Sequence, residues 1–415
     1  MKSALVFASL ASAAIIHSPV SYQGHKVFRI PVLENGDHIR TVIDQLELDV
    51  WQPPAKKGAY ADVQVAPHKL AAFEKRMSGH TYDKMHDDLA EAISLEAEFE
   101  GYDGPADNST WFKSYHAYDD HLKWMQDMAS QHSSNVKIVT SGNSHAGSPI
   151  TGMHIFGSSG GGKKPAVVFH GTVHAREWIV AMSVEYMANE LITKYSSDQA
   201  IKAVVEKYDF YIFPIVNIDG FKFSQTSDRM WRKNRNPNQG SNCVGTDVNR
   251  NWPYKWDVPG SSTNPCNEAY RGPSAGSSTE LKSLSTYLQQ IKSQQGVKLY
   301  IDWHSYSQLF MTPYSWSCTE RPPNHNALQA LAKGASDAIQ RVHGLQFKYG
   351  PICNTIYPAA GSSVDWVNDV LKGENVFTVE LRDTGKGGFI LPPEQIIPSG
   401  EESFAGAMYL FQNMK

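Results

Sequence analysis

The stretch Pro165-Ala166-Val167-Val168-Phe169-His170-Gly171-Thr172-Val173-His174-Ala175-Arg176-Glu177 decides the fold of this chain. It opens with a short apolar run that ends in a glycine turn, the pattern of a buried strand. Apolar residues at helical spacing continue to Lys194, which predicts a helix from Glu177. A buried strand leading into a helix is typical of an α/β sheet, and the polar residues lie at the junction.

A second apolar run, Val297–Trp303, predicts another strand and ends directly before His304. Open α/β sheets bind ligands at the carboxyl ends of their strands, so we expect His304 to lie beside His174 and Glu177. Two imidazoles and one carboxylate leave one position of a zinc ion open, as catalytic rather than structural zinc sites do. The three residues therefore predict a hydrolase that holds one Zn²⁺ in its catalytic domain.

Length and charge narrow the class of protein. The chain has 415 residues, 41% of them hydrophobic, which is enough for one large core and a smaller one. The net charge of −4, without any basic block, argues against nucleic-acid binding. Residues 17–108 carry 9 Lys+Arg against 16 Asp+Glu, whereas the charges of the rest nearly balance. The chain thus divides into an acidic N-terminal part and a larger remainder.

The first residues have the pattern of a secretory signal peptide. Lys2 precedes an apolar stretch, and Ala11-Ser12-Ala13 offers small residues for cleavage, so we assign 1–13 to it. The apolar run ends at Ile16, short of the roughly 20 residues that span a bilayer, which excludes a membrane anchor. We expect a secreted, extracellular protein whose four cysteines form disulfides. Four cysteines allow three pairings, and the residues alone do not choose among them.

The acidic part predicts a small α+β plait. Its expected elements, in order, are a strand at Lys26–Val32, a helix at Asp37–Leu46, strands at Leu48–Trp51 and Asp62–Val65, and helices at Pro67–Met77 and Asp87–Glu100. The turn-forming stretch Gly101-Tyr102-Asp103-Gly104-Pro105 then breaks the last helix. We place a domain boundary there, with one domain over 14–108 and a second over 109–415.

The second part alternates strands with helices. Strands are expected near Val136–Thr140, Ile150–Phe156, Pro165–His170, Asp209–Val216, Val297–Trp303 and Val376–Arg382. Helices are expected near Tyr118–Gln131, Glu177–Lys194, Thr279–Lys292, Asn326–Val342 and Val364–Val370. This order predicts an α/β domain with one mixed sheet covered by helices on both faces.

Six motifs together identify a family resemblance. They are His170–Ile179, Met230–Arg235, Asp247–Trp252, His304–Gln308, Ile356–Ser362 and Thr378–Gly385. They resemble the motifs of the zinc metallocarboxypeptidases, in the secreted carboxypeptidase A-like branch, and they follow the family's order from about residue 110 to 415. The resemblance implies an eight-stranded mixed sheet sandwiched by helices and a monomeric hydrolase acting on peptide and protein C-termini.

The resemblance also implies roles for single residues. Glu380 corresponds to the general base, and Arg232 to the arginine that stabilises the oxyanion. An interpretation of Glu380 as a merely ion-paired strand-end residue is disfavoured by the surrounding Thr378–Gly385 match. Asp247 is expected to orient a zinc-binding histidine.

Substrate recognition is implied at a second group of residues. Arg250 is expected to bind the free terminal carboxylate, with Asn249 and Tyr357 as its companions. Arg176 and Tyr306 resemble residues of the next subsites. Phe389 is either a further subsite residue or a packing residue. Arg229 either contacts the substrate or belongs to a solvated basic face with Lys233 and Arg235.

The position that selects the terminal side chain is Val364. In the family, Asp at this position selects Lys or Arg, whereas an apolar residue selects apolar and aromatic side chains. Ile352, Ile356 and Thr378 match further lining positions, and no buried carboxylate is visible there. We expect release of Phe, Tyr, Leu and similar residues. A basic-residue enzyme is disfavoured by Val364, and an inactive binding homologue by the retained Glu380 and zinc ligands.

Two further expectations come from the resemblance. It pairs Cys243 with Cys266 and Cys318 with Cys353. It also makes the acidic part, 14–108, an inhibitory pro-domain of a zymogen, whose charge suits an arginine-rich cleft. No Lys or Arg lies between Lys84 and Lys113, so we expect an activating protease of other than tryptic specificity to cut near residues 100–112.

Overall fold

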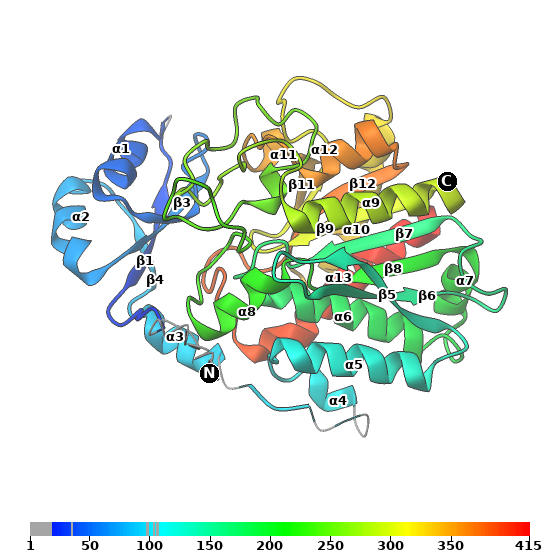
Figure 1. The fold of residues 1–415 in the computed structure, drawn as a ribbon. Helices are drawn as coiled ribbons and strands as arrows, with labels where there is room; N and C mark the ends of the chain where they lie inside the picture. The colour runs from blue at the N-terminus through cyan, green and yellow to red at the C-terminus, as the bar shows by residue number, and fades with distance from the viewer. Residues whose placement is uncertain (1–18, 35, 97–98, 103, 105–107) are drawn as a thin grey trace, which may run out of the picture.

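The computed structural model describes residues 19–34, 36–96, 99–102, 104 and 108–415. The predicted signal peptide, 1–13, lies outside the described residues. Figure 1 shows a small domain, built from the first elements of the chain, against one side of a larger domain. Among the residues described, no helix is long and apolar enough to cross a membrane.

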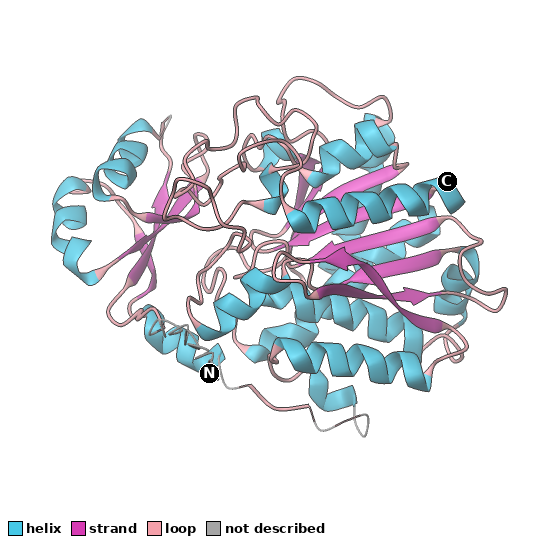
Figure 2. Ribbon diagram, viewed as in Figure 1, coloured by secondary structure: helices cyan, strands magenta, loops and turns pink. Residues whose placement is uncertain are grey.

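The small domain is a four-stranded antiparallel sheet covered by two helices on one face (Figure 2). Its elements are β1 (Lys26–Pro31), α1 (Asp37–Leu46), β2 (Asp49–Gln52), β3 (Tyr60–Val65), a 3₁₀ turn (Pro67–Lys69), α2 (Leu70–Arg76) and β4 (Asp83–His86). Phe28 and Ile30 of β1 pack with the helices, whereas the alternate residues Val27 and Arg29 face the other way. That second face carries the side chains that meet the large domain.

The large domain contains an eight-stranded mixed sheet with the strand order β11-β10-β12-β9-β7-β8-β6-β5. The strands are β5 (Val136–Asn143), β6 (Pro149–Ile155), β7 (Ala166–Gly171), β8 (Asp209–Phe213), β9 (Val297–His304), β10 (Leu309–Thr312), β11 (Lys348–Pro351) and β12 (Asn375–Glu380). The central strands β12, β9, β7 and β8 are parallel and almost wholly buried. This explains their continuous apolar sequences, because both faces are covered.

Helices cover both faces of this sheet, with α9 on the near side of Figure 1 and α13 on the far side. The long helices are α5 (Tyr118–Gln131), α6 (Trp178–Thr193), α7 (Gln199–Lys207), α8 (Ile218–Thr226), α9 (Thr279–Gln295), α10 (His325–His343) and α13 (Ile396–Asn413). The short ones are α3 (Leu89–Glu96), which follows the small domain, α4 (Asn108–Trp111), α11 (Ile352–Thr355) and α12 (Ser363–Trp366) with a following π turn (Val367–Leu371). Short 3₁₀ turns lie at Val248–Arg250 and Pro393–Gln395. The predicted mixed sheet between helices is confirmed.

Several elements escaped prediction from the sequence: β4, β10, β11, α7, α8 and α13. Helix α13 contains Pro398, Gly400 and Gly406, residues that usually argue against a helix interior. Pro398 lies in the first turn, where its missing N–H costs nothing. A Cβ on Gly400 would come within 2.3 Å of the Tyr186 ring, so this glycine allows α13 to approach α6 closely.

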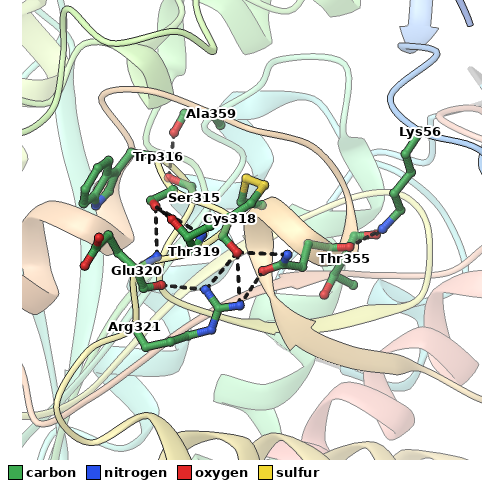
Figure 3. The surroundings of a disulfide bond; sticks show 12 residues. Lys56, Ser315, Trp316, Cys318, Thr319, Glu320, Arg321, Thr355 and Ala359 are labelled. Atoms are coloured by element: carbon green, nitrogen blue, oxygen red, sulfur yellow. Dashed lines mark hydrogen bonds between the residues drawn. A yellow bond between two sulfur atoms is a disulfide. The ribbon is translucent and has the colours of Figure 1, made fainter. Parts of the chain in front are cut away.

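Both disulfides implied by the family resemblance are present, Cys243–Cys266 and Cys318–Cys353. Figure 3 shows the second, which ties the segment after β10 to α11. Arg321 joins the same two segments by donating to the Cys318 carbonyl and to Asn354 Oδ1 at 2.9 Å. Lys56 of the small domain reaches this region and donates to the Thr355 carbonyl at 3.2 Å. The small domain therefore contacts the segment that leads to Tyr357.

Candidate metal centre and substrate cleft

The metal-binding residues meet because β7 and β9 are adjacent and parallel, with His170 opposite Asp302. Their carboxyl ends share one edge of the sheet, so the loop after β7 brings His174 and Glu177 to His304 at the end of β9. Helix α6 begins at Trp178, one residue later than predicted, and Glu177 is its N-cap. Both residues therefore precede the helix, and the loop, rather than a shared helical face, brings them together.

His174, Glu177 and His304 present ligand atoms that all lie within 4.8 Å of one another. Glu177 Oε1 lies 2.7 Å from His174 Nδ1, and Glu177 Oε2 lies 3.3 Å from His304 Nδ1. The two Nδ1 atoms are 3.1 Å apart, and all three side chains are buried. Burial opposes ionisation of Glu177, but the two histidines outweigh it and hold its pKa below the ordinary value. The donor set fits zinc, which prefers imidazole and carboxylate ligands.

Each histidine is also oriented by a buried carboxylate through its Nε2 atom. Asp247 Oδ1 lies 3.2 Å from His174 Nε2, as expected from the sequence. Asp302 Oδ2 lies 3.1 Å from His304 Nε2, a contact that the sequence did not reveal. The only signal for it was an acidic residue inside an apolar strand, two positions before His304. Carboxylates in these positions fix the ring orientation of metal-binding histidines.

Glu380 ends β12 opposite His304 of β9 and lines the same cleft. Its Oε2 atom is buried and has no hydrogen-bond partner among the described residues. Burial raises the pKa of Glu380 to about 8, against the opposing charges of His304 and Arg232. A buried carboxylate with a free oxygen in a cleft is chemically poised to exchange a proton.

Arg232 lines the cleft beside Glu380. Asp247 Oδ2 accepts from its Nη2 at 2.8 Å and from its Nε at 3.2 Å. Although burial opposes its ionisation, Asp247 has a pKa held well below the ordinary value by Arg232 and His174. One carboxylate thus fixes both the arginine and a metal-binding histidine.

The residues expected to bind a terminal carboxylate lie together. Asn249 and Arg250 belong to the 3₁₀ turn after Asp247, and both are buried. Arg250 donates to the Asn249 carbonyl at 2.9 Å through Nη1, and its Nε has no partner in the described part of the chain. Its guanidinium lies 5.9 Å from the centre of the Tyr357 ring, and Tyr357 lines the cleft.

The residues matched to the side-chain pocket come from three elements. Val364 lies in α12, Ile352 in α11 and Thr378 in β12, and Ile356 lines the cleft. All four are buried. Asp302 is opposite Thr378 in the sheet, yet its side chain is fully buried and bonded to Ser363 and His304.

The outer subsite residues contact the small domain in this structure. Tyr306 donates its hydroxyl to Asp62, which is held by Arg29, and Phe389 packs edge-on against Tyr306. Arg176 lies over the Phe389 ring at 4.2 Å. Arg229 is bonded to Glu96 of α3 and is not among the residues that line the cleft.

Trp51 and Gln52 of β2 line the cleft together with the metal-binding residues. The cavity left beneath them is about 30 Å³, room for one or two water molecules but not for a peptide residue. No sequence pattern predicts that Trp51 and Gln52 fill the cleft, because their place depends on how the two domains pack. The small domain therefore covers the site.

Comparisons with known proteins agree with this arrangement. The sequence profile described as zinc carboxypeptidase matches residues 121–406, and the one described as carboxypeptidase activation peptide matches residues 33–96. A metallocarboxypeptidase A-like protein of Trichophyton verrucosum is 51% identical, with all of both chains covered. Carboxypeptidase A2 of Mus musculus is 35% identical, over 96% of each chain.

Solved structures show the same fold. The crystal structure of thrombin activatable fibrinolysis inhibitor superposes with a TM-score of 0.87 and 27% identity, covering 95% of this chain and 99% of that one. Carboxypeptidase A from Helicoverpa armigera gives a TM-score of 0.81 at 25% identity, over 94% and 97%. This chain belongs to the zinc carboxypeptidase family and carries that family's activation peptide, as its buried His-Glu-His centre, its matching profiles and its full-length relatives show.

Proposed function

We propose that the protein is a secreted zymogen of a carboxypeptidase that removes apolar and aromatic residues from peptide and protein C-termini. The observation that carries this proposal is the meeting of Glu380, Arg232 and the metal-binding residues in one cleft. We expect a monomeric enzyme, as the family resemblance implies. The signal peptide at 1–13 supports secretion.

His174, Glu177 and His304 would hold the zinc ion, which would supply Lewis-acid polarisation of the scissile carbonyl and a lowered pKa for a nucleophilic water. Glu380 Oε2, which has no hydrogen-bond partner among the residues the structure describes, takes the proton of the attacking water and returns it to the leaving amine. Arg232, fixed by Asp247, directs its guanidinium at the negative charge that develops on the carbonyl oxygen.

Arg250 fixes the terminal carboxylate and makes the enzyme an exopeptidase. Its guanidinium is buried beside Tyr357 and offers a free Nε–H for a forked pair with a carboxylate. Asn249 and Tyr357 complete this group, while Arg176, Tyr306 and Phe389 contact residues further from the C-terminus. Glu96 occupies the donors of Arg229 only while the pro-domain is in place, so we keep Arg229 as a substrate-contact residue of the cut enzyme.

Val364 supports the preference for apolar side chains. A basic side chain would need a facing carboxylate in the buried pocket. Asp302, the acid nearest to Thr378 in the sheet register, has no exposed surface and is used by Ser363 and His304. Ile352, Ile356 and Val364 therefore present an apolar lining, to which Thr378 adds no charge.

Residues 14–108 act as the inhibitory pro-domain, and 109–415 form the catalytic domain. Trp51 and Gln52 exclude substrate until an activating protease cuts near residues 100–112. Two acidic residues of the pro-domain bind particular residues of the larger domain: Asp62 binds Tyr306, and Glu96 binds Arg229.

Two peptides that differ only in a final Phe or Arg test this proposal. We expect the chain cut near residue 110 to release Phe faster than Arg, and a zinc chelator to abolish release. The uncut chain is expected to release neither. Faster release of Arg would contradict the A-type preference, and full activity of the uncut chain would contradict inhibition. No release by a folded, zinc-loaded, cut chain would favour a binding role instead.

A further inference from the structure

Ser363 connects the metal-binding and carboxylate-binding parts of the site. Its hydroxyl donates to Asp302 Oδ2, and its backbone N–H donates to Asn249 Oδ1 at 2.9 Å. Both partners in turn contact His304 Nε2: Asp302 Oδ2 and Asn249 Nδ2 each lie 3.1 Å from it. All four residues are buried. One serine therefore holds a closed group of contacts around the outer side of His304.

Asp302 depends strongly on this serine. Its side chain has no exposed surface, and Oδ1 has no hydrogen-bond partner in the described part of the chain. Oδ2 alone carries the bonds to Ser363 and His304. A buried carboxylate with so few donors is sensitive to the loss of any one of them. Without the serine hydroxyl, His304 would be the only hydrogen-bonding partner left to the Asp302 side chain within the described part of the chain.

The chain around Ser363 is fixed independently of the metal site. Ser363 is the first residue of α12, and the Ser362 hydroxyl caps that helix by accepting from Asp365 N. Asp365 Oδ2 accepts from the backbone N–H of Trp316, and Asp365 Oδ1 from that of Ser315, each at 3.1 Å. The two Asp365 bonds anchor the start of α12 to the segment after β10, so Ser363 presents its two donors from a rigid support.

We propose that Ser363 is a positioning residue. It positions His304 through Asp302, and it positions Asn249 directly. Retention of the metal and recognition of the terminal carboxylate then depend on one side chain and its backbone N–H. The inference rests on the proposed function, in which Asn249 contacts the substrate carboxylate. Ser363 itself touches neither the substrate nor the metal in this assignment.

Two substitutions of Ser363 separate its two bonds. Ser363→Ala removes the hydroxyl donor and keeps the N–H that bonds Asn249. Ser363→Pro removes both donors, and proline is accepted at the first position of a helix. The preceding residue, Ser362, already has the extended conformation that proline requires, with φ −87° and ψ 154°. The difference between the two variants therefore reports on the bond to Asn249.

The first measurement is the rate at which the zinc-loaded full-length chain loses its metal to excess chelating dye. We expect Ser363→Ala to accelerate the loss about tenfold, the scale on which outer contacts of metal-binding histidines act. Ser363→Pro should lose zinc at a similar rate. This readout needs no peptide, so it stands even if the proposed substrate preference fails.

The second measurement is peptide hydrolysis by the zinc-saturated, cut chain. We expect Ser363→Pro to raise KM about tenfold above the value for Ser363→Ala, with a smaller change in kcat, because the carboxylate-binding side chain loses its support. A KM that is the same in both variants would contradict the Asn249 half of the proposal.

Ser362→Ala is the matched control, since it removes a buried hydroxyl one residue away that does not contact Asp302 or Asn249. It should leave the rate of zinc loss unchanged.

Asp302→Asn with and without Ser363→Ala tests whether Ser363 acts on zinc retention through Asp302. The double variant should lose zinc no faster than Asp302→Asn alone. Additive effects, equal acceleration by Ser362→Ala, or no acceleration by Ser363→Ala would each overturn the proposal. If the proline variant does not fold, this cycle decides the zinc-retention half of the proposal.

Discussion

Arg229 of the catalytic domain and Glu96 of α3 form a two-pronged ion pair in which both side chains are buried. Nε lies 2.6 Å from Oε2 and Nη2 lies 2.8 Å from Oε1. The guanidinium also stacks on Trp178, with its central carbon 3.7 Å from the ring centre. This pair lies outside the cleft, so it fastens the N-terminal part without touching the reacting atoms.

Glu96→Gln should loosen the pro-domain. Removing one partner of a buried ion pair leaves the other charge uncompensated, at a cost of about 3–5 kcal/mol. We expect faster cutting by an added protease and measurable activity of the uncut chain. Asp87→Asn is the control, because Asp87 pairs with Lys26 and Lys84 at the surface. Equal behaviour of the two variants would contradict a fastening role for Glu96.

Val364→Asp should change the preferred C-terminal residue from Phe to Arg. A carboxylate in the buried pocket would pair with a basic side chain and would repel an apolar one, changing kcat/KM by at least about tenfold in each direction. Val364→Asn is the control, since it adds polarity of similar size without charge and should not gain release of Arg. If a folded Val364→Asp variant still prefers Phe, Val364 does not line the pocket that selects the terminal side chain.

Replacing Cys318 and Cys353 together by serine should destabilise the chain. The bridge spans 35 residues, and loops of this size are stabilised by roughly 3–4 kcal/mol. KM should also rise, because Cys353 lies in α11, which leads to Tyr357. Denaturant unfolding and peptide kinetics measure the two effects. Arg321→Ala, which removes only exposed bonds between the same segments, should change stability by about 1 kcal/mol or less.

Glu380→Gln should stabilise the zinc-free chain increasingly as the pH rises. The folded-state pKa of Glu380, about 8, exceeds its ordinary value of 4.5, so between these values the folded state binds more protons than the unfolded state. The wild-type free energy of unfolding therefore falls across this window, by at most roughly 1.4 kcal/mol per pH unit. Glutamine does not titrate. The Tm difference, measured in chelator, should grow from about pH 5 to pH 8. A constant difference would place the pKa of Glu380 outside this window.

Much of the site was predictable because its residues belong to local patterns. His174 and Glu177 follow a continuous apolar strand, and His304 and Glu380 end two more. Parallel strands place such ends at one edge of the sheet, even where long segments connect the strands. The apolar strands β7, β9 and β12 were therefore located correctly, and their end residues converge in the structure.

Other features arise only when distant segments pack. Trp51 and Gln52 end an ordinary edge strand, and only the docking of the small domain places them in the cleft. Asp302 looks like an isolated acid in an apolar strand until Ser363, 61 residues later, meets it. Helix α13 contains one proline and two glycines, which disfavour a helix. Its packing against α6 and α10 stabilises the helical conformation.

The sequence by itself indicated the His174, Glu177 and His304 group and the mixed sheet, because strand periodicity and motif spacing are local properties of the chain, and the family resemblance added the prediction for Glu380. The tertiary structure alone decided how the cleft is covered and how its residues are held. Contacts such as Glu96 with Arg229 and Ser363 with Asp302 depend on side chains brought together from far apart in the chain, and their stabilisation comes from burial that no single segment can achieve.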